Sequence, residues 1–591
     1  MLRRNIIHKF TVFVFILLST VLLAGCGGMG QKTRKPPGNF SRGLQLSDKA
    51  SGTPSAVVNP EGNLIQVVIP SQDGDSGNSF RYIQIDQDAR ITMDQELALG
   101  LAPYVRSPKV VINGEELHLV WAARQSTSKG WELWHTIINN NAEITSLPKQ
   151  ISQGTERVSQ FDITGDDHGN LTIVWEDSES FSVHISRISG RGEIISPPAL
   201  MITEGEVPAL IADIESIHVA WMQGDKLFYS QVFDDSSFPL EGEELAKIQV
   251  AVGNRLDGPV IGIADSHVYL FWSILRQVGL EAGTAITEYL IFPKSEPAQA
   301  HRALVTIFPV SEDLLQPYQG SISLSQLVPA PPENYMSTNY ILDPRTLPNP
   351  AQGAQIVAVS ANQNLRLDSH IQIAVGIFEE GNYQGYTVGT HTTEISQNPY
   401  ISTDTGGNLH LIWREGFSGN RVYYATTSPT AKGILDRVVL SDISNFLLSG
   451  GLEAITGILL FPFAFPWMAI GLVMMIILRL ARNDEDVTQR LSQFLLVLAL
   501  VSYQISKLLF LPDMLIYVPF SAWLDLPEGL GLIFRIAVPI MIAGLGITAA
   551  EWRRRRSSDS PPSSLAYYMT VILVDTLLTL AVYGVIFLGE Y

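Results

Sequence analysis

The sequence predicts an all-β propeller followed by an all-α membrane domain of four helices. The first observation behind this prediction is a short phrase that recurs seven times between residues 62 and 413, each time as a turn followed by an alternating strand. The second is a set of four apolar stretches after residue 450, each long enough to cross a bilayer. The third is an apolar N-terminal segment with a basic start, which is typical of export. The chain is therefore expected to have an exported part and a membrane part.

Residues 1–26 form the predicted signal segment, in which basic residues precede an apolar run that ends in LAGC at 23–26. This ending resembles a bacterial lipobox, and the resemblance implies cleavage before Cys26 and lipidation of its thiol. The alternative is an uncleaved segment that remains as a membrane anchor. Cys26 is the only cysteine in the 591 residues, so the exported part has neither an internal disulfide nor a multi-cysteine metal site.

Residues 27–60 contain several Pro, Gly and Ser residues, and we predict a flexible tether there. Between residues 31 and 450 the chain has 27 Lys and Arg against 47 Asp and Glu. An acidic body of this kind repels nucleic acid, which argues against DNA or RNA as a partner.

The repeated phrase predicts a β-propeller over residues 61–440. It reads EELHLVW at 115–121, GNLTIVW at 169–175 and GNLHLIW at 407–413. Most phrase starts lie about 40 to 55 residues apart, the length of a four-stranded blade. The gap between the phrases at 265 and 368 is about twice as long. We therefore favour seven blades with an insertion near 293–355, and eight blades are the alternative.

Two short segments resemble the Asp-box of bacterial sialidase-like propellers, Ser/Thr-x-Asp-x-Gly-x-Thr-Trp. The sequence DGDSGNSF at 73–80 matches with Asp73 in place of the first hydroxyl residue, and STDTG at 402–406 matches the first half. The resemblance implies a propeller. It does not imply sialidase activity, because the arginine triad, the Tyr/Glu nucleophile pair and the acidic Asp of those enzymes cannot be placed in this sequence.

Four membrane spans follow, and basic residues set their orientation. Arg479, Arg482 and Arg490 lie between the first two spans, and the run from Arg553 to Arg556 lies between the last two. Lys and Arg near span ends collect on the cytoplasmic side. We therefore predict a multi-pass protein of the cell membrane, with residues 27–450 and the C-terminus outside. The predicted spans are about 452–480, 491–511, 530–550 and 566–588.

Few polar side chains interrupt these spans. Asp575 lies near mid-depth of the fourth span, and Lys507 in the second and Arg535 in the third are candidate partners. One interpretation is a proton or ion relay. The other, which we favour, is a neutral acid or a pair that holds the helices together, because a transport path normally needs more than one such group.

Trp131 and Trp134 lie outside the repeat, and we predict that they share one face of a strand, either in the core or as an exposed ligand platform. The repeated Trp and His of the phrase are expected instead to pack and to form hydrogen bonds within each blade. The sequence contains no P-loop, HExxH or Gly-x-Ser-x-Gly motif. We assign no catalytic residue, metal or cofactor.

These features favour a non-enzymatic surface protein, held by membrane lipid, whose propeller binds an external glycan or protein. Two alternatives remain. One is a sialidase-like glycoside hydrolase, and the other is an accessory subunit of an export or transport complex that contacts a membrane protein partner.

Overall fold

The structure is a computed structural model, and its compact units are a β-rich unit and a C-terminal helical unit. The signal segment and Cys26 lie outside the described residues. The described residues are 33, 35–59, 61–72, 78–97, 99, 104–114, 116–153, 157–166, 168–233, 239–310, 314–331, 337–349, 351, 353–365, 368–392, 394–437, 451, 454–482, 487, 489–519, 528–556 and 563–584.

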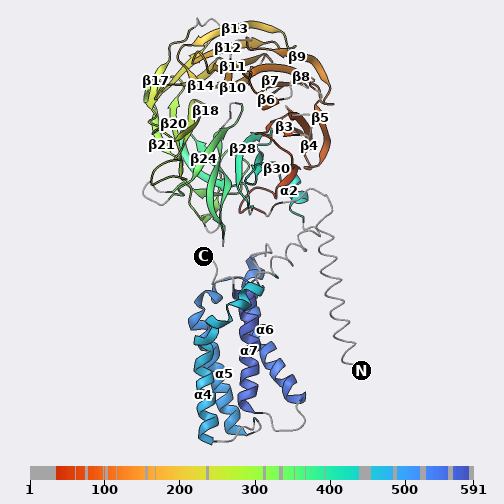
Figure 1. Cartoon of the computed structure of the whole chain (residues 1–591), viewed down its shortest axis with the longest axis vertical. Helices are drawn as coiled ribbons and strands as arrows, with labels where there is room; N and C mark the ends of the chain where they lie inside the picture. The colour runs from red at the N-terminus through yellow and green to blue at the C-terminus, as the bar shows by residue number, and fades with distance from the viewer. Residues whose placement is uncertain are drawn as a thin grey trace. The chain divides into compact units, whose positions relative to one another are not determined.

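The β-rich unit is a propeller of seven antiparallel sheets, which confirms the favoured blade number (Figure 1). Each of the first four blades is a four-stranded meander. Their strands are β2 (Ser55–Val58), β3 (Leu64–Gln72), β4 (Asn78–Asp86) and β5 (Ile91–Leu97); β6 (Tyr104–Asn113), β7 (Glu116–Arg124), β8 (Glu132–Ile138) and β9 (Ile144–Gln150); β10 (Val158–Gly165), β11 (Leu171–Asp177), β12 (Ser182–Ile188) and β13 (Ile194–Ile202); and β14 (Glu206–Ala212), β15 (Ile217–Gln223), β16 (Lys226–Val232) and β17 (Glu243–Lys247).

Blade 5 follows the same pattern, and the last two blades depart from it. Blade 6 has six strands, and blade 7 takes its outermost strand, β1, from the start of the chain. The strands of these three blades are β18 (Arg255–Ala264), β19 (His267–Leu275), β20 (Ala285–Pro293) and β21 (His301–Leu304) in blade 5; β22 (Gln316–Pro317), β23 (Gln326–Pro329), β24 (Ile341–Thr346), β25 (Ala354–Leu365), β26 (Asp368–Glu379) and β27 (Asn382–Val388) in blade 6; and β28 (Ser396–Thr403), β29 (Leu409–Glu415), β30 (Arg421–Thr426) and β1 (Leu44–Ser47) in blade 7.

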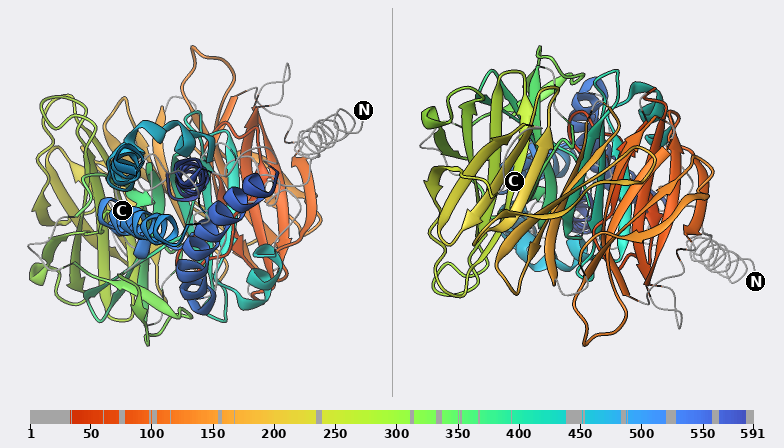
Figure 2. Two further views of the ribbon diagram at one scale, coloured as in Figure 1. Left: turned by 90° about the horizontal axis from the view of Figure 1, so that it is seen from below. Right: turned by 90° about the horizontal axis from the view of Figure 1, so that it is seen from above.

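The first strands of the seven meanders form a closed ring around the propeller axis, which Figure 1 shows from one end, while Figure 2 shows the blades edge-on. In ring order they are β2, β6, β10, β14, β18, β24 and β28, and β28 contacts β2. Pairing of β1 with β30, which sets Leu44 opposite Tyr424, completes blade 7. Residues 44–47 and 55–58, which the sequence predicts to be part of a tether, thus form propeller strands.

The region expected as an insertion near 293–355 belongs largely to the blades. It supplies β21 of blade 5, and it supplies β22, β23 and β24 of blade 6. β23 pairs with β27 and adds to the outer edge of blade 6, while β24 pairs with β25 and supplies its inner strand. The long gap between repeated phrases therefore holds regular strands that lack the phrase.

The repeated phrase forms the second strand of six blades and the third strand, β26, of blade 6. In β11 every side chain is buried, because neighbouring blades cover both faces of the sheet. The phrase tryptophans are fully buried, as expected for residues that pack between sheets. They are Trp121, Trp175, Trp221, Trp272 and Trp413.

The described part of the helical unit has three helices long and apolar enough to span a membrane, so the prediction of four such spans is wrong. The apolar helix Phe461–Ile477 is shorter than the other three. The backbone of its first turn, Phe461–Ala464, is a 3₁₀ helix with Pro462 near its start. Prolines at 462 and 466 lack the N–H that a continuous α-helix needs, so the predicted 452–480 helix is interrupted.

The propeller unit has a short α-helix and a short 3₁₀ helix, and the described part of the helical unit has longer α-helices and 3₁₀ turns. Glycine allows close approach between helices: a Cβ on Gly471 of α4 would lie 2.8 Å from the carbonyl oxygen of Ala499 on α5. The bounds are α2 (Pro429–Leu435), η2 (Pro297–Gln299), η4 (Phe461–Ala464), α4 (Phe465–Arg482), α5 (Arg490–Phe510), η5 (Pro512–Leu515), α6 (Glu528–Arg556) and α7 (Ser564–Tyr583).

Candidate functional site

The inner strands share an irregularity near the end at which they begin. In β6, β10, β14, β18, β24 and β28 the pairing with the next strand slips by one residue, as in a β-bulge. A bulge bends its strand and re-aims the neighbouring side chains. Five of the bulges contain a left-handed residue that is followed by proline. These residues are Ser107, Val207, Gly258, Asp343 and Asn398.

A buried carboxyl pair lies at the bulges of blades 5 and 6. Asp343 is 7% exposed and accepts hydrogen bonds from the backbone N–H of Asn398 (3.3 Å) and from the hydroxyl of Ser360 (3.4 Å). Burial, followed by the neighbouring charge of Asp257, raises the pKa of Asp343.

Two arginines flank this pair. Nη1 of Arg345 lies 3.9 Å from Oδ2 of Asp257, and Nη1 of Arg414 donates to the side-chain oxygen of Asn398 at 3.4 Å. The result is an array of two carboxyl groups and two guanidinium groups. Such an array offers donors and acceptors together, which suits the hydroxyl groups of a polar ligand.

Blade 7 adds a carboxyl group that titrates near neutral pH. Glu415 ends β29 and is 5% exposed. Burial raises its pKa to about 7, with a further contribution from Glu394, while the positive charge of Arg421 acts in the opposite direction. Arg421 itself forms an ion pair with Glu394. The end of this blade is therefore sensitive to pH.

A cationic stack occupies the same end of blade 2. The guanidinium carbons of Arg106 and Arg124 lie 4.1 and 4.4 Å from the ring centre of Trp131, and Arg124 also lies 5.3 Å from the ring centre of Tyr104. β6, β7 and the residue preceding β8 supply these groups.

The two predicted platform tryptophans do not share a face. Trp131 packs against the apolar cluster that contains Trp175, whereas Trp134 packs against the cluster that contains Phe80. Side chains in a strand alternate, so residues three apart point to opposite faces. The prediction of one shared face is wrong for that reason.

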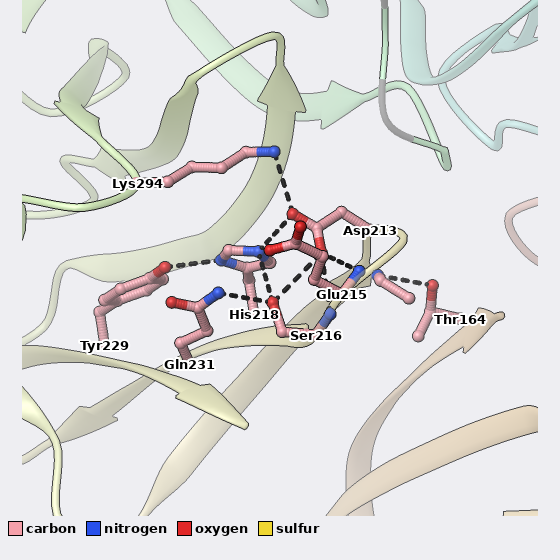
Figure 3. Close-up of polar contacts among 9 residues, drawn as sticks. Thr164, Asp213, Glu215, Ser216, His218, Tyr229, Gln231 and Lys294 are labelled. Atoms are coloured by element: carbon pink, nitrogen blue, oxygen red, sulfur yellow. Dashed lines mark hydrogen bonds and ion pairs between the residues drawn. The ribbon is translucent and has the colours of Figure 1, made fainter. Parts of the chain in front are cut away.

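A serine, a histidine and an aspartate meet at the turn between β14 and β15, in an arrangement that superficially resembles a catalytic triad (Figure 3). Nε2 of His218 lies 3.2 Å from the Ser216 hydroxyl and 3.0 Å from the Asp213 carboxylate. Nδ1 is hydrogen-bonded to the Tyr229 hydroxyl at 2.6 Å. In a triad, serine and aspartate use different imidazole nitrogens. In this network both use one nitrogen, so it does not have triad geometry.

Repetition supports a structural role for that network. Blade 7 has the same arrangement, with His410 between Asp404 (3.4 Å) and the Tyr424 hydroxyl (2.9 Å). Lys294 donates to Asp213 at 2.9 Å. Although burial favours the neutral acid, the hydrogen bonds from Lys294 and His218 hold the pKa of Asp213 below its usual range. These groups fix a hairpin turn.

The helical unit contains a buried cluster of polar side chains, centred on Asp575. Asp575 is fully buried and accepts hydrogen bonds from Lys507 (2.7 Å), Tyr503 (2.7 Å) and Gln504 (3.1 Å). The structure thus brings Asp575 and Lys507 together. Arg535 is exposed, and within the described residues no ion pair joins it to Asp575.

No protein-family model matches the chain, and no curated protein matches it. Many solved structures do match. The polysaccharide lyase Uly1 is 9% identical over 66% of this chain and 99% of its own, with a TM-score of 0.40. The endo-arabinase from Bacteroides thetaiotaomicron (12%, 65% and 94%, TM-score 0.29) and the β-propeller domain of the Trilobed protease from Pyrococcus furiosus (9%, 64% and 94%, TM-score 0.34) are two others. At these values the likeness carries no argument about function.

Proposed function

We propose that this chain is a membrane-anchored surface protein whose propeller binds an external ligand without catalysing a reaction. The binding end is the one at which the inner strands begin, and the ligand class that fits it best is a glycan. The observation that carries the proposal is the array of Asp257, Asp343, Arg345 and Arg414, because sugar hydroxyl groups both donate and accept hydrogen bonds.

The binding proposal is tested with the full-length protein in nanodiscs on an array of neutral and acidic oligosaccharides. We expect Asp343→Asn and Arg414→Gln to weaken binding of any captured glycan by about tenfold, the loss expected for one or two hydrogen bonds to charged groups. Arg90→Gln, an exposed change in the turn between β4 and β5, is the matched control. Unchanged binding by both site variants would contradict the proposal.

Anchoring rests on the apolar helices, to which we add a lipid on Cys26. Since α5, α6 and α7 each have the length and apolar character of a membrane span, the Cys26→Ser variant should remain in the membrane fraction but keep its signal segment. Gel mobility and metabolic labelling with a fatty acid measure the processing. Release of Cys26→Ser into the soluble fraction would contradict anchoring by the helices.

A further inference from the structure

Blade 2 holds two positive charges against one indole ring. Arg106 is part of β6 and Arg124 ends β7, and both guanidinium groups lie within 4.4 Å of the ring centre of Trp131. The charge of Arg124 disfavours the charged form of Arg106, so the arrangement is unfavourable unless something offsets it. Stacking on an aromatic ring supplies part of the compensation.

Among the residues that the structure describes, no carboxylate forms an ion pair with either arginine. Arg106 donates to the backbone carbonyls of Val158 (3.4 Å) and Ser159 (3.2 Å). Nε of Arg124 is buried and has no hydrogen-bond partner in the described part of the chain. A buried donor without a partner costs free energy, and a charged one costs more.

Several other propeller arginines form an ion pair with a carboxylate. Arg81 pairs with Asp94 at 2.6 Å, Arg157 pairs with Glu179 at 2.9 Å, and Arg302 pairs with Glu288 at 2.6 Å. The body is acidic, with 47 Asp and Glu against 27 Lys and Arg in residues 31–450, so carboxylates are plentiful. Arg106 and Arg124 have no ion pair with a carboxylate of the described residues, so they differ from these examples. Burial, together with the charge of Arg124, also lowers the pKa of Arg106, as expected for an uncompensated cation.

We propose that Arg106, Arg124 and Trp131 form an anion-binding subsite that accepts the carboxylate or sulfate group of an acidic glycan. The planar guanidinium groups match the two oxygens of such an anion, and the exposed part of the aromatic group offers an apolar contact for a sugar ring. The subsite lies at the same end of the blades as the carboxyl pair, because Arg106 and Asp257 occupy the same position relative to the bulges of β6 and β18. This inference rests on the proposed function and adds the charge of the ligand to it.

Three matched probes test the proposal by calorimetry on the full-length protein in nanodiscs. They are a galacturonate hexamer, the neutral hexamer obtained by reducing its carboxyl groups, and that neutral hexamer carrying sulfate esters. We expect the wild type to bind at least one anionic hexamer about tenfold more tightly than the neutral one, and added salt to reduce the difference. The comparison of the two anionic hexamers distinguishes carboxylate from sulfate.

Variants locate the binding to the subsite. Arg124→Gln and, separately, Arg106→Gln should each lower the affinity for the preferred anionic hexamer about tenfold and leave the affinity for the neutral hexamer unchanged. Arg191→Gln, in the exposed turn between β12 and β13 at the opposite end of blade 3, is the matched control and should bind as the wild type does. Unfolding midpoints of all variants check that the fold is intact. If one arginine variant fails to fold, the other and the salt dependence of the wild type decide.

The outcomes separate this inference from the proposed function. Equal affinity for neutral and anionic hexamers would overturn the anion subsite and leave glycan binding in place. Binding of none of the three hexamers, together with no captured glycan on the array, would overturn both. Tighter binding of poly-glutamate than of either anionic hexamer would overturn the assignment of the ligand as a glycan.

Discussion

The propeller and the helical unit both bury polar and charged side chains, but they do so differently. In the propeller the same hairpin network occurs in blades 4 and 7, around His218 and His410, and each copy is satisfied within or next to its own blade. In the described part of the helical unit one ion pair, Lys507 with Asp575, joins α5 to α7. The propeller thus distributes its polar contacts over repeats, whereas the helices concentrate theirs at one place.

The strongest effect should come from breaking that ion pair. Lys507→Met should destabilise the helical unit by roughly 3–5 kcal/mol, because it leaves the Asp575 carboxyl group buried without its partner. Replacing both residues, as in Lys507→Met with Asp575→Leu, should restore most of the loss, since no uncompensated charge remains. Unfolding in mixed micelles, followed by the helical circular dichroism signal, measures both.

Arg535→Gln is the control for this comparison, because Arg535 is exposed. It should change the stability by less than about 0.5 kcal/mol. A double variant as unstable as Lys507→Met would show that the pair is not the contact on which the helices depend.

A smaller effect is expected from the repeated networks of the propeller. Asp213→Ala and Asp404→Ala should each cost about 1–3 kcal/mol, the usual loss when hydrogen bonds to a carboxylate are removed. The two networks lie in different blades, so the double variant should show the sum of the two losses to within about 0.5 kcal/mol. Tryptophan fluorescence during denaturation measures the propeller. A clearly non-additive double variant would mean that the blades do not act separately.

The weakest effect should be a pH dependence at blade 7. Folding raises the pKa of Glu415 from its ordinary value of 4.5 to about 7, so between these values the folded state binds more protons than the unfolded state. The free energy of unfolding should therefore fall as the pH rises from about 5 to about 7. Glu415→Gln should flatten this part of the profile, measured as the unfolding midpoint against pH.

Glu243→Gln is the matched control for the pH profile, because Glu243 is exposed on β17. It should leave the slope of the profile as it is in the wild type. A wild-type stability that rises between about pH 5 and pH 7 would contradict the expected direction.

Local features of the fold could be predicted from the sequence. The repeated phrase located the second strand of six blades and the buried tryptophans such as Trp175, because alternating side chains and turn residues are properties of neighbouring positions in the sequence. The role of Leu44–Ser47 could not be predicted in this way. Four residues form a strand there only because β30 lies beside them, and that contact depends on the closure of the ring.

The candidate site was harder to predict. Lys507 could be proposed as the partner of Asp575 because charges in apolar helices are few. The carboxyl pair and the cationic stack join residues from separate strands, and nothing local marks Arg106 or Asp343 as special. One signal was present: a proline follows the bulge residue in five inner strands, as in Ser107-Pro108 and Asn398-Pro399. This second repeat marks the end of the propeller at which the site lies.

Closure of the ring by β1 also determines when the propeller can finish folding during its synthesis. The hydrogen bond between Ser41 and Thr426 spans 385 residues, so the first strand to be made must wait for the last. At about 5–20 residues per second, ribosomes need roughly 20–80 s to make the intervening chain. During that time β30 has not been made, so β1 has no strand to pair with and blade 1 lacks its contact with blade 7. We therefore expect protection of the early blades from proteases to appear in one late step, after residue 426 has left the ribosome.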